Sequence, residues 1–453
     1  MRNQSKSHMM ELINELWFLK RDIVSDEYDQ ALFRLIADIK DQTVSAGNAH
    51  VKIHEYPTGE QCWTWQVPEK WTCHKAYLET LDGQRLIDYT HHPLHVISYS
   101  LPFDGIVSRD ELLEHLHVHP KHPEAIPFIF KYYDRDWGLC ASQVLRDKLD
   151  EERYRVVIQT SFEPGTLKVG EVIIPGETDE SFMLVAHLCH PAMANDDLTG
   201  VVVGLEVARS LMTDLKSYYT YRLLILPETI GSVAYLSHNE DLIPKMVGGL
   251  FLEMLGNDSN HALQGSFQVD SQVDRCLVST LKQLDPESYV APYRMVINND
   301  ERQFNAPGVR VPMLSLSRVL RHNSPNWPYP EYHSSLDTPD IISTSRLEES
   351  KNYVLELIQA WENNQYIVNK FKGEIFCSGY GIWIDYRTNP EGHQRLFEIM
   401  ELCDGEHTVA DIATKLDISF QAVWQVISLL LEKSLVYLSR TPQSTTPSRS
   451  QNS

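Results

Sequence analysis

The sequence predicts an α/β protein built around a mainly parallel, mixed sheet covered by helices, with two smaller units attached. Short apolar runs of strand length alternate with helix-like segments between about residues 154 and 370, the pattern of a sheet covered on both faces. A turn-rich stretch of short β-type segments precedes this region, and three helix-like segments follow it. We therefore expect four parts: an α/β domain from residues 1–60 and 137–370, an inserted β-rich module over 61–136, a winged helix-turn-helix-like unit over 371–440, and a disordered tail over 441–453.

The composition is that of a soluble globular protein, with 453 residues of which 42% are hydrophobic and 23% charged. The formal net charge of -22 argues against a nucleic-acid or anionic-membrane partner, because both need a basic face. Seven scattered cysteines without a CxxC motif favour reduced thiols. The sequence contains neither a signal-like apolar segment at its start nor a span of about 20 apolar residues. We expect a cytoplasmic protein.

The first 136 residues are expected to contain helices first and short strands afterwards. Apolar residues at helical spacing predict two helices between residues 9 and 46, and the alternating VKIHEY predicts a strand at 51–56. The segments AYLET, RLIDY and HVISYS are typical of strands, and Asp-Gly and His-Pro turns separate them. These strands would form the inserted module.

The α/β pattern becomes clear after residue 154. YRVVIQTSF (154–162) and LKVGEVIIPG (167–176) alternate like the two strands of a hairpin. Buried strands follow at FMLVA, YRLLIL, GGLFL and VPMLSLSR, with helices expected at 200–215, 276–284 and 347–363.

The C-terminal unit is expected to begin with a strand-like segment at 373–386, followed by three helices and a short strand. This is the layout of a winged helix-turn-helix. A DNA-binding role is disfavoured, because residues 391–440 carry eight acids against four bases and the segment SFQAVWQVISLL, in the recognition-helix position, lacks Lys and Arg. We favour a structural role or a contact with another protein or a second copy of the chain.

Residues able to bind a metal follow the buried strands in order. His187 and Asp196 follow the first strand, Glu228 the second and Glu253 the third, and a later loop supplies His333. Imidazole and carboxylate groups at one edge of a sheet suit a cation such as Zn²⁺. One carboxylate on a short loop can bridge two ions, and a spare Glu can activate water.

The segments AHLCHP, ANDDLTG, LPETIGS, FLEMLG and YHSSLDTPD resemble the motifs of M28-type zinc aminopeptidases and of bacterial aminopeptidase-like proteins found beside polysaccharide-biosynthesis genes. The resemblance extends from about residue 154 to 369 and implies a zinc-exopeptidase-like fold. It also implies that Glu228 is the general base and that Asp197 stiffens the loop. The metal ligands that it implies are His187, Asp196, Glu253 and His333.

Two positions depart from the family pattern. The Glu-Glu pair is Glu228-Thr229 here, so Glu228 is either base or ligand, and we favour base. The usual His-x-Asp ends in Cys189, a poor acceptor for orienting an imidazole. His190 is the candidate to substitute, as ligand or as orienting group. The number of zinc ions, one or two, stays open.

Four further residues are candidates for substrate binding. Asp300 and Glu301 would hold a substrate ammonium group, or else form a solvated turn or an internal salt bridge. Arg321 and Tyr329 precede the late histidine and would line the pocket, unless their loop only packs.

The sequence therefore favours a zinc-dependent aminopeptidase-like hydrolase acting on a small peptide or aminoacyl substrate. Three alternatives stay open. The same site could remove an acyl group from a modified sugar or metabolite, or transfer that group. The chain could be a non-catalytic scaffold that keeps the fold, or a DNA-binding regulator.

Overall fold

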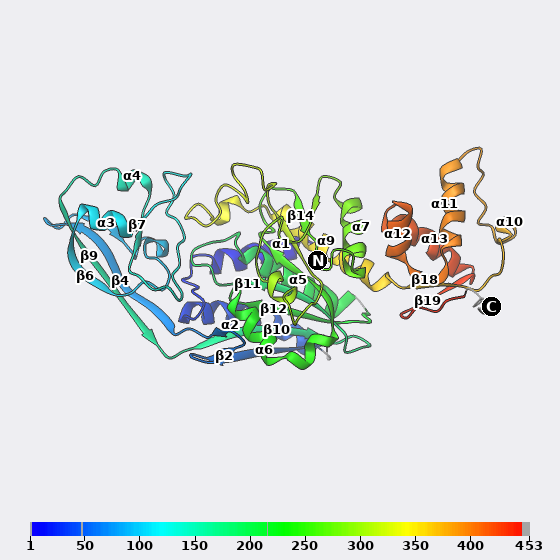
Figure 1. Ribbon diagram of the computed structural model, residues 1–453, viewed down its shortest axis with the longest axis horizontal. Coiled ribbons are helices and arrows are strands. Elements are labelled where there is room, and N and C mark those ends of the chain that lie inside the picture. The colour runs from blue at the N-terminus through cyan, green and yellow to red at the C-terminus, as the bar shows by residue number, and fades with distance from the viewer. Residues whose placement is uncertain (1, 47–48, 215, 446–453) are drawn as a thin grey trace, which may run out of the picture.

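The computed structural model describes residues 2–46, 49–214 and 216–445, which form three parts in a row (Figure 1). The β-rich module lies at one end, the large sheet with its helices in the middle, and the C-terminal unit at the other end. Every helix among the described residues is too short or too polar to cross a lipid bilayer.

The middle part is organised around an eight-stranded sheet in the order β1-β10-β12-β11-β13-β16-β14-β15. Neighbouring strands run parallel from β12 to β16, whereas β10 pairs antiparallel with β1 and β12, and β14 antiparallel with β16. The fold class is thereby confirmed as a mixed sheet with a parallel centre. The strands are β1 (His50–Pro57), β10 (Thr166–Ile174), β11 (Ser181–His187), β12 (Thr220–Leu226), β13 (Met246–Glu253), β14 (His261–Gln264), β15 (Tyr289–Ala291) and β16 (Met313–Arg318).

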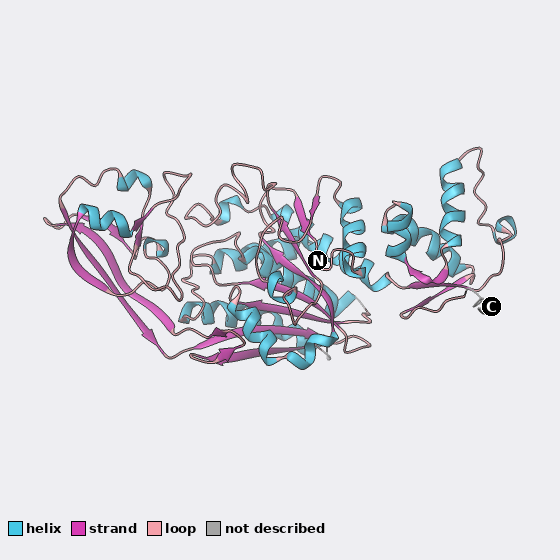
Figure 2. Cartoon of the chain, in the orientation of Figure 1, coloured by secondary structure: helices cyan, strands magenta, loops and turns pink. Residues whose placement is uncertain are grey.

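The helices of this part pack in layers on the sheet (Figure 2). Helix α5 (Leu198–Asp214) contacts β11, β12 and β13, and its valines at 201–203 are completely buried, as expected for a helix that is apolar on most of its surface. Helices α1 (Arg2–Leu16), α2 (Asp26–Ala46) and α9 (Thr344–Asn363) pack on α5. The other helices are α6 (Ile230–His238), α7 (Gln272–Leu284), α8 (Glu301–Phe304) and the 3₁₀ turns η2 (Glu240–Lys245) and η3 (Pro339–Ile341).

The β-rich module contains a separate four-stranded sheet in the order β5-β4-β9-β6. Its strands are β4 (Lys70–Thr80), β5 (Arg85–Asp88), β6 (Phe103–Ser108) and β9 (Arg153–Glu163). Its shorter elements are η1 (Pro93–His95), α3 (Arg109–His115), β7 (Leu116–His117), β8 (Leu139–Cys140) and α4 (Gln143–Arg146). The strands β2 (Gln61–Cys62) and β3 (Trp65–Gln66) pair with each other, and β2 contacts α6 of the middle part (Figure 1).

Two expectations for this region are wrong. The segments 154–162 and 167–176 do not form a hairpin, because β9 pairs with β4 and β6 while β10 pairs with β1 and β12. The chain crosses from one sheet to the other at residues 164–165, and alternation alone does not identify a strand's partner. Segment 95–100 is not a strand, since Pro93 starts a 3₁₀ turn and only isolated bridges follow at Val96 and Ser98. The pairing of β9 favours a module that extends beyond residue 136, and the domain limits stay a prediction.

The C-terminal unit contains a three-stranded sheet, β18-β17-β19, and four helices. The three predicted helices and the final strand are present, but segment 373–386 is not a strand. It holds the short α10 (Cys377–Tyr380), with Ile375, Cys377 and Ile382 buried and the aromatic residues Phe376 and Trp383 exposed. The winged-helix assignment stays a prediction, and residues 446–453 of the predicted tail lie outside the described residues. The elements are β17 (Tyr366–Asn369), α10 (Cys377–Tyr380), α11 (Pro390–Glu401), β18 (Asp404–Thr408), α12 (Val409–Leu416), α13 (Phe420–Glu432) and β19 (Val436–Ser439).

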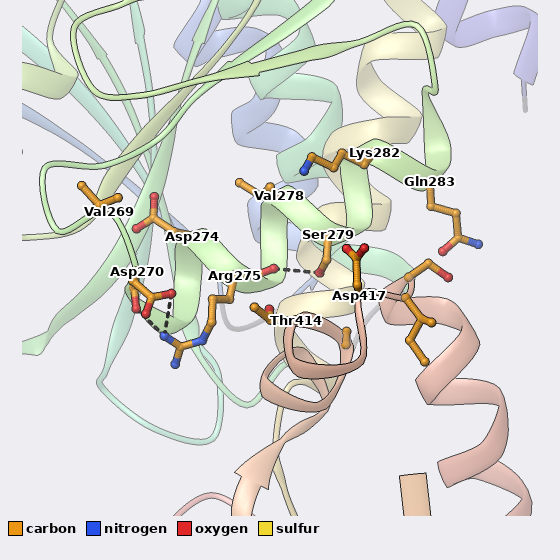
Figure 3. Close-up of a pocket in the computed structure, with 13 residues that line it drawn as sticks. Val269, Asp270, Asp274, Arg275, Val278, Ser279, Lys282, Gln283, Thr414 and Asp417 are labelled. Atoms are coloured by element: carbon orange, nitrogen blue, oxygen red, sulfur yellow. Dashed lines mark hydrogen bonds and ion pairs between the residues drawn. The ribbon is translucent and has the colours of Figure 1, made fainter. Parts of the chain in front are cut away.

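The C-terminal unit is joined to the middle part through α7 and α9. Arg275 of α7 donates a hydrogen bond from Nε to Asp411 Oδ1 at 2.8 Å. Figure 3 shows Arg275 also reaching Asp270 at the edge of a cavity of about 490 Å³, which residues of α7 and the C-terminal unit line together. The interface is therefore partly open and held by polar contacts.

Glu362, near the end of α9, is a second junction. Its carboxylate is buried and accepts the backbone N–H groups of Tyr218 and Tyr219 at 3.1 and 3.3 Å. It also accepts the hydroxyl of Tyr221 at 2.9 Å and a guanidinium N–H of Arg440 at 3.4 Å. One side chain thus ties α9 to the start of β12 and to the C-terminal unit.

Replacing Glu362 by Ala should lower the free energy of unfolding by about 3 kcal/mol, because several buried donors lose a charged acceptor. Urea unfolding of the purified protein measures this. Glu356→Ala, an exposed position on the same helix, should change stability by less than about 0.5 kcal/mol. Equal stability of the two variants would contradict the role assigned to Glu362.

Candidate metal centre

The predicted metal-binding residues, called the cluster below, gather at the carboxyl ends of three neighbouring parallel strands. His187 is the last residue of β11 and lies opposite Leu226, the last residue of β12, so Glu228 follows two residues beyond the same edge. Glu253 is the last residue of β13, the other neighbour of β11. Parallel pairing therefore brings these side chains to one edge of the sheet.

Two loops complete the cluster. The loop between β11 and α5 carries Asp196, and the loop between β16 and α9 carries His333. Asp196 Oδ1 lies 3.2 Å from His187 Nε2, and Asp196 Oδ2 lies 3.2 Å from His333 Nε2. His187 Nε2 is 3.8 Å from Glu253 Oε1. The structure thus brings together the four residues that the sequence singled out as ligands.

His190 also enters the cluster. Its Nδ1 lies 3.2 Å from Asp196 Oδ2, and its Nε2 lies 3.1 Å from Glu228 Oε2. Three groups of three potential ligands result: a first made by His187, Asp196 and Glu253, a second by His190, Asp196 and His333, and a third by His187, Cys189 and His190. Asp196 belongs to the first and second groups and turns Oδ1 toward His187 and Oδ2 toward His190 and His333.

Several buried atoms of the cluster have no hydrogen-bond partner within the described part of the chain, although native proteins pair nearly all such atoms. In a tetrahedral zinc site with bonds of about 2.0–2.1 Å, neighbouring ligand atoms lie roughly 3.3 Å apart. The three contacts of 3.2 Å match that spacing, so the donor set fits a divalent metal ion. The unpaired atoms are both ring nitrogens of His187, Nδ1 of His190, Nε2 of His333, both carboxylate oxygens of Asp196 and Oε2 of Glu253.

The electrostatics of the cluster also favour a cation. Burial raises the pKa of Glu253 to about 7, an effect that nearby His187 opposes. Burial likewise raises the pKa of Glu301 to about 8 and that of Asp197 well above its usual range. The pKa of Glu228 is lowered to about 2, because the contact with His190 outweighs burial. A divalent ion would stabilise the ionised form of the buried carboxylates.

Asp197 braces the loop that carries Asp196. Its Oδ1 accepts the backbone N–H of Gly200 at 2.9 Å and that of Met254 at 2.8 Å, which ties the loop to α5 and to the end of β13. A Cβ at position 200 would lie 2.4 Å from Asp197 Oδ2 and from the Leu252 carbonyl oxygen. Only glycine fits there, so the Gly of the ANDDLTG motif has a steric cause.

Asp337 is a loop-bracing residue to which the sequence analysis assigned no role. Its Oδ1 accepts the N–H of Asn195 at 2.6 Å and that of Ala194 at 3.2 Å, and its Oδ2 accepts the N–H of Asp196 at 3.1 Å. Tyr329, expected to line the pocket, is buried and donates its hydroxyl to Asp337 Oδ2 at 2.7 Å. The signal was present in YHSSLDTPD, where Asp337 follows His333 by four residues.

Arg21, in the connection between α1 and α2, supports the same loop and was not predicted. It is fully buried, and its guanidinium donates to the carbonyl oxygens of Leu188 and Met193, both at 2.9 Å. Burial lowers its pKa to about 10, which leaves it charged at neutral pH. Sequence periodicity gives no signal for a contact between residues so far apart.

The remaining substrate-binding candidates lie in different places. Asp300 and Glu301 are fully buried, so the solvated-turn alternative is wrong. Asp300 accepts the N–H of Thr229 at 2.9 Å, and Glu301 accepts the side-chain amide of Gln264 at 3.0 Å. Arg321 is exposed, and its guanidinium lies over the ring of Tyr289, 4.8 Å from the centroid. A substrate contact of these residues stays a prediction.

Cys189 occupies the position where the family pattern has an acid. It is buried, and its sulfur accepts the backbone N–H of Glu228 at 3.0 Å. The thiol therefore helps to fix the backbone that carries Glu228.

Aromatic residues of the inserted module border the cluster. Phe128 donates its backbone N–H to the His333 carbonyl oxygen at 2.8 Å. Its ring centroid lies 5.0 Å from that of His190 and 5.3 Å from that of His333. Phe130, which is 46% exposed, packs on Phe128 and stacks on Tyr132. The module thus supplies an aromatic wall, here defined as Phe128, Phe130 and Tyr132, beside the cluster.

Comparison with known proteins agrees with this geometry. The family described as a domain of unknown function (DUF4910) matches residues 10–364. A Clostridium acetobutylicum protein, named for polysaccharide biosynthesis and an aminopeptidase-like domain, is 33% identical over 395 residues, which are 86% of this chain and 88% of that protein.

Solved structures share the fold. A crystal structure described as a peptidase from Clostridium acetobutylicum matches with a TM-score of 0.81 and 30% identity, covering 96% of this chain and 97% of that one. A zinc aminopeptidase from Bacillus subtilis matches with a TM-score of 0.58 and 13% identity, over 78% and 94% of the two chains. The resemblance to M28-type zinc aminopeptidases and their aminopeptidase-like relatives is thereby confirmed.

Replacing Asp337 by Ala should destabilise the protein by about 3 kcal/mol, because three backbone N–H groups and a buried hydroxyl lose their acceptor. Zinc affinity, measured by calorimetry, should fall with it, since the loop that carries Asp196 is no longer held. The exposed Asp340 is the matched control, and Asp340→Ala should leave both quantities unchanged. Unchanged zinc affinity in Asp337→Ala would show that the loop does not depend on this contact.

Proposed function

The chain belongs to the DUF4910 family and has an aminopeptidase-like fold, and from this premise we propose that it is a zinc-dependent hydrolase that cleaves an amide bond. The simplest form is an aminopeptidase acting on a small peptide or aminoacyl substrate. The observation that carries the proposal is the convergence of unpaired, buried imidazole and carboxylate atoms on Asp196.

The residues that would hold zinc are His187, Asp196, Glu253 and His333. A zinc ion there would polarise the substrate carbonyl and lower the pKa of water. The chain itself holds these ligands in position, through Asp197 and Asp337 on the Asp196 loop. Such bracing suits catalysis, because a pre-organised site needs no rearrangement when charge develops.

Glu228 would act as general base. Its side chain is 27% exposed, whereas that of the neighbouring Asp196 is 2% exposed, so Glu228 is the more accessible of these two carboxylates. In this role Glu228 takes a proton from the attacking water and returns it to the leaving amine. The Cys189 sulfur and His190 Nε2 hold its backbone and its side chain, respectively.

The aromatic wall would shape the substrate site. A peptide or an acyl group would lie between it and the cluster, and Phe130 offers the exposed ring surface. A second candidate function is deacylation or acyl transfer on a modified sugar or metabolite, and it draws on the words polysaccharide biosynthesis in the name of the Clostridium acetobutylicum relative. Hydrolysis assays with aminoacyl anilides and with N-acetylated sugars, run side by side, separate the two candidates.

The seven cysteines are all unpaired and buried, which supports a cytoplasmic setting. Exposed aromatic residues of the C-terminal unit, such as Phe376 and Trp383, support a protein contact through that unit, because aromatic side chains are enriched at interfaces.

Replacing Glu228 by Gln should lower kcat on aminoacyl substrates by about 10²- to 10⁴-fold, because the variant cannot take up the proton. Steady-state kinetics of zinc-replete protein measures this. Glu177→Gln, at an exposed position, should keep the activity of the unmodified protein. An unchanged kcat in Glu228→Gln would exclude Glu228 as the base, and zinc-replete protein without any turnover would favour the scaffold alternative.

Replacing Phe130 by Ala should reduce kcat/KM by roughly 2- to 10-fold, the effect of losing one aromatic contact. The change should appear in KM, because Phe130 would bind substrate and not the reacting atoms. Phe267→Ala removes an equally exposed ring elsewhere on the α/β domain and should have no effect. If both variants keep the same KM, the aromatic wall does not contact the substrate.

A further inference from the structure

The second group of ligands, around Asp196 Oδ2, is the part of the cluster that the family pattern does not explain. In that pattern the residue after the base is an acid that serves as a metal ligand. In this chain the residue after Glu228 is Thr229. Its N–H donates to Asp300 at 2.9 Å, and its hydroxyl oxygen accepts a hydrogen bond from Arg302 at 3.4 Å. Thr229 is thus directed away from metal binding.

His190 fills the space beside Asp196 instead. His190 is only 2% exposed. Its Nδ1 lies 3.2 Å from Asp196 Oδ2 and lacks a hydrogen-bond partner among the described residues. His333 Nε2 is also unpaired and lies 3.2 Å from the same oxygen. The imidazole rings are nearly perpendicular, with centroids 5.1 Å apart. The ligand atoms of His190, Asp196 and His333 therefore lie within 4.8 Å of one another.

Each of these 3.2 Å contacts with Asp196 is an ion pair when the imidazole is protonated, but neither aligns as a hydrogen bond. The same spacing matches ligand atoms around a tetrahedral ion, roughly 3.3 Å apart.

Glu228 fixes the tautomer that such a ligand needs. His190 Nε2 lies at hydrogen-bond distance from Glu228 Oε2, 3.1 Å. A proton on Nε2 leaves the Nδ1 lone pair free to bind a metal, the arrangement in which a carboxylate orients a metal-binding histidine.

We propose that His190, Asp196 and His333 form a second divalent-metal position beside the one formed by His187, Asp196 and Glu253. His190 takes the place of the missing acid at position 229, and Glu228 is a positioning residue for His190 as well as the base. This inference rests on the proposed function, because it assumes that the cluster binds metal at all.

Metal stoichiometry tests the proposal without an activity assay. Full-length protein is stripped with a chelator, reloaded with Zn²⁺, freed of excess by gel filtration and analysed for metal content. Unmodified protein should hold two equivalents, His190→Ala one, and His187→Ala one. His322→Ala, which alters an exposed histidine packed on Trp327, should hold two. His190→Gln, which preserves bulk, should repeat the His190→Ala result, and circular dichroism checks that each variant is folded.

Calorimetry with Zn²⁺ adds a second readout. Glu228→Gln should weaken the affinity for the second zinc equivalent by roughly 10- to 100-fold, because it removes a carboxylate that orients a ligand. The affinity for the first zinc equivalent should be unchanged. Two equivalents in His190→Ala would overturn the proposal. The proposal would also be overturned if the unmodified protein and His190→Ala each bound one equivalent of zinc and His187→Ala bound none. That result would leave the proposed function standing. No bound zinc in the folded, unmodified protein would overturn the proposed function together with this inference.

Discussion

The buried carboxylate of Asp196 is the constraint around which the structure is arranged. A charged group removed from water is costly unless other charges compensate it. Here both oxygens face imidazole nitrogens and neither is hydrogen-bonded within the described part of the chain. The loop that holds this group is fixed from three sides, by Asp337, by Asp197 and by Arg21. These contacts hold the buried, charged carboxylate of Asp196 in a defined position.

The three parts of the molecule have different relations to that loop. The central sheet supplies the ligand side chains from the ends of parallel strands, and the inserted module reaches the His333 loop through Phe128. The C-terminal unit lies at the other end of the molecule and joins α7 and α9 through Arg275 and Arg440 (Figure 1). Effects on substrate selection are therefore expected from the module, and effects on assembly or stability from the C-terminal unit.

The sequence predicted the site better than its surroundings. The end of a strand can be predicted from the sequence, because the apolar run stops at a polar residue. The carboxyl ends of neighbouring parallel strands lie at the same edge of the sheet. This placed His187, Glu228 and Glu253 together. Arg21 and Phe128 could not be found in this way, because they reach the site across 167 and 205 residues of sequence to Leu188 and His333. The partner of β9 was missed for a related reason, since alternation shows which face is buried but not which strand lies beside it.

Cys189, which departs from the family pattern, and its neighbour His190 both contact Glu228, and this bears on whether the site is active or vestigial. Cys189 accepts the N–H of Glu228, and His190 contacts the carboxylate of the same residue, so both hold Glu228 in place. A scaffold that no longer bound metal would gain stability by replacing buried, unpaired imidazoles and carboxylates with apolar side chains. The described part of this chain keeps seven such unpaired atoms on five residues of the cluster. Retention of so costly a cluster, with new contacts around the altered positions, favours a metal site rebuilt with a different ligand over one that has been lost.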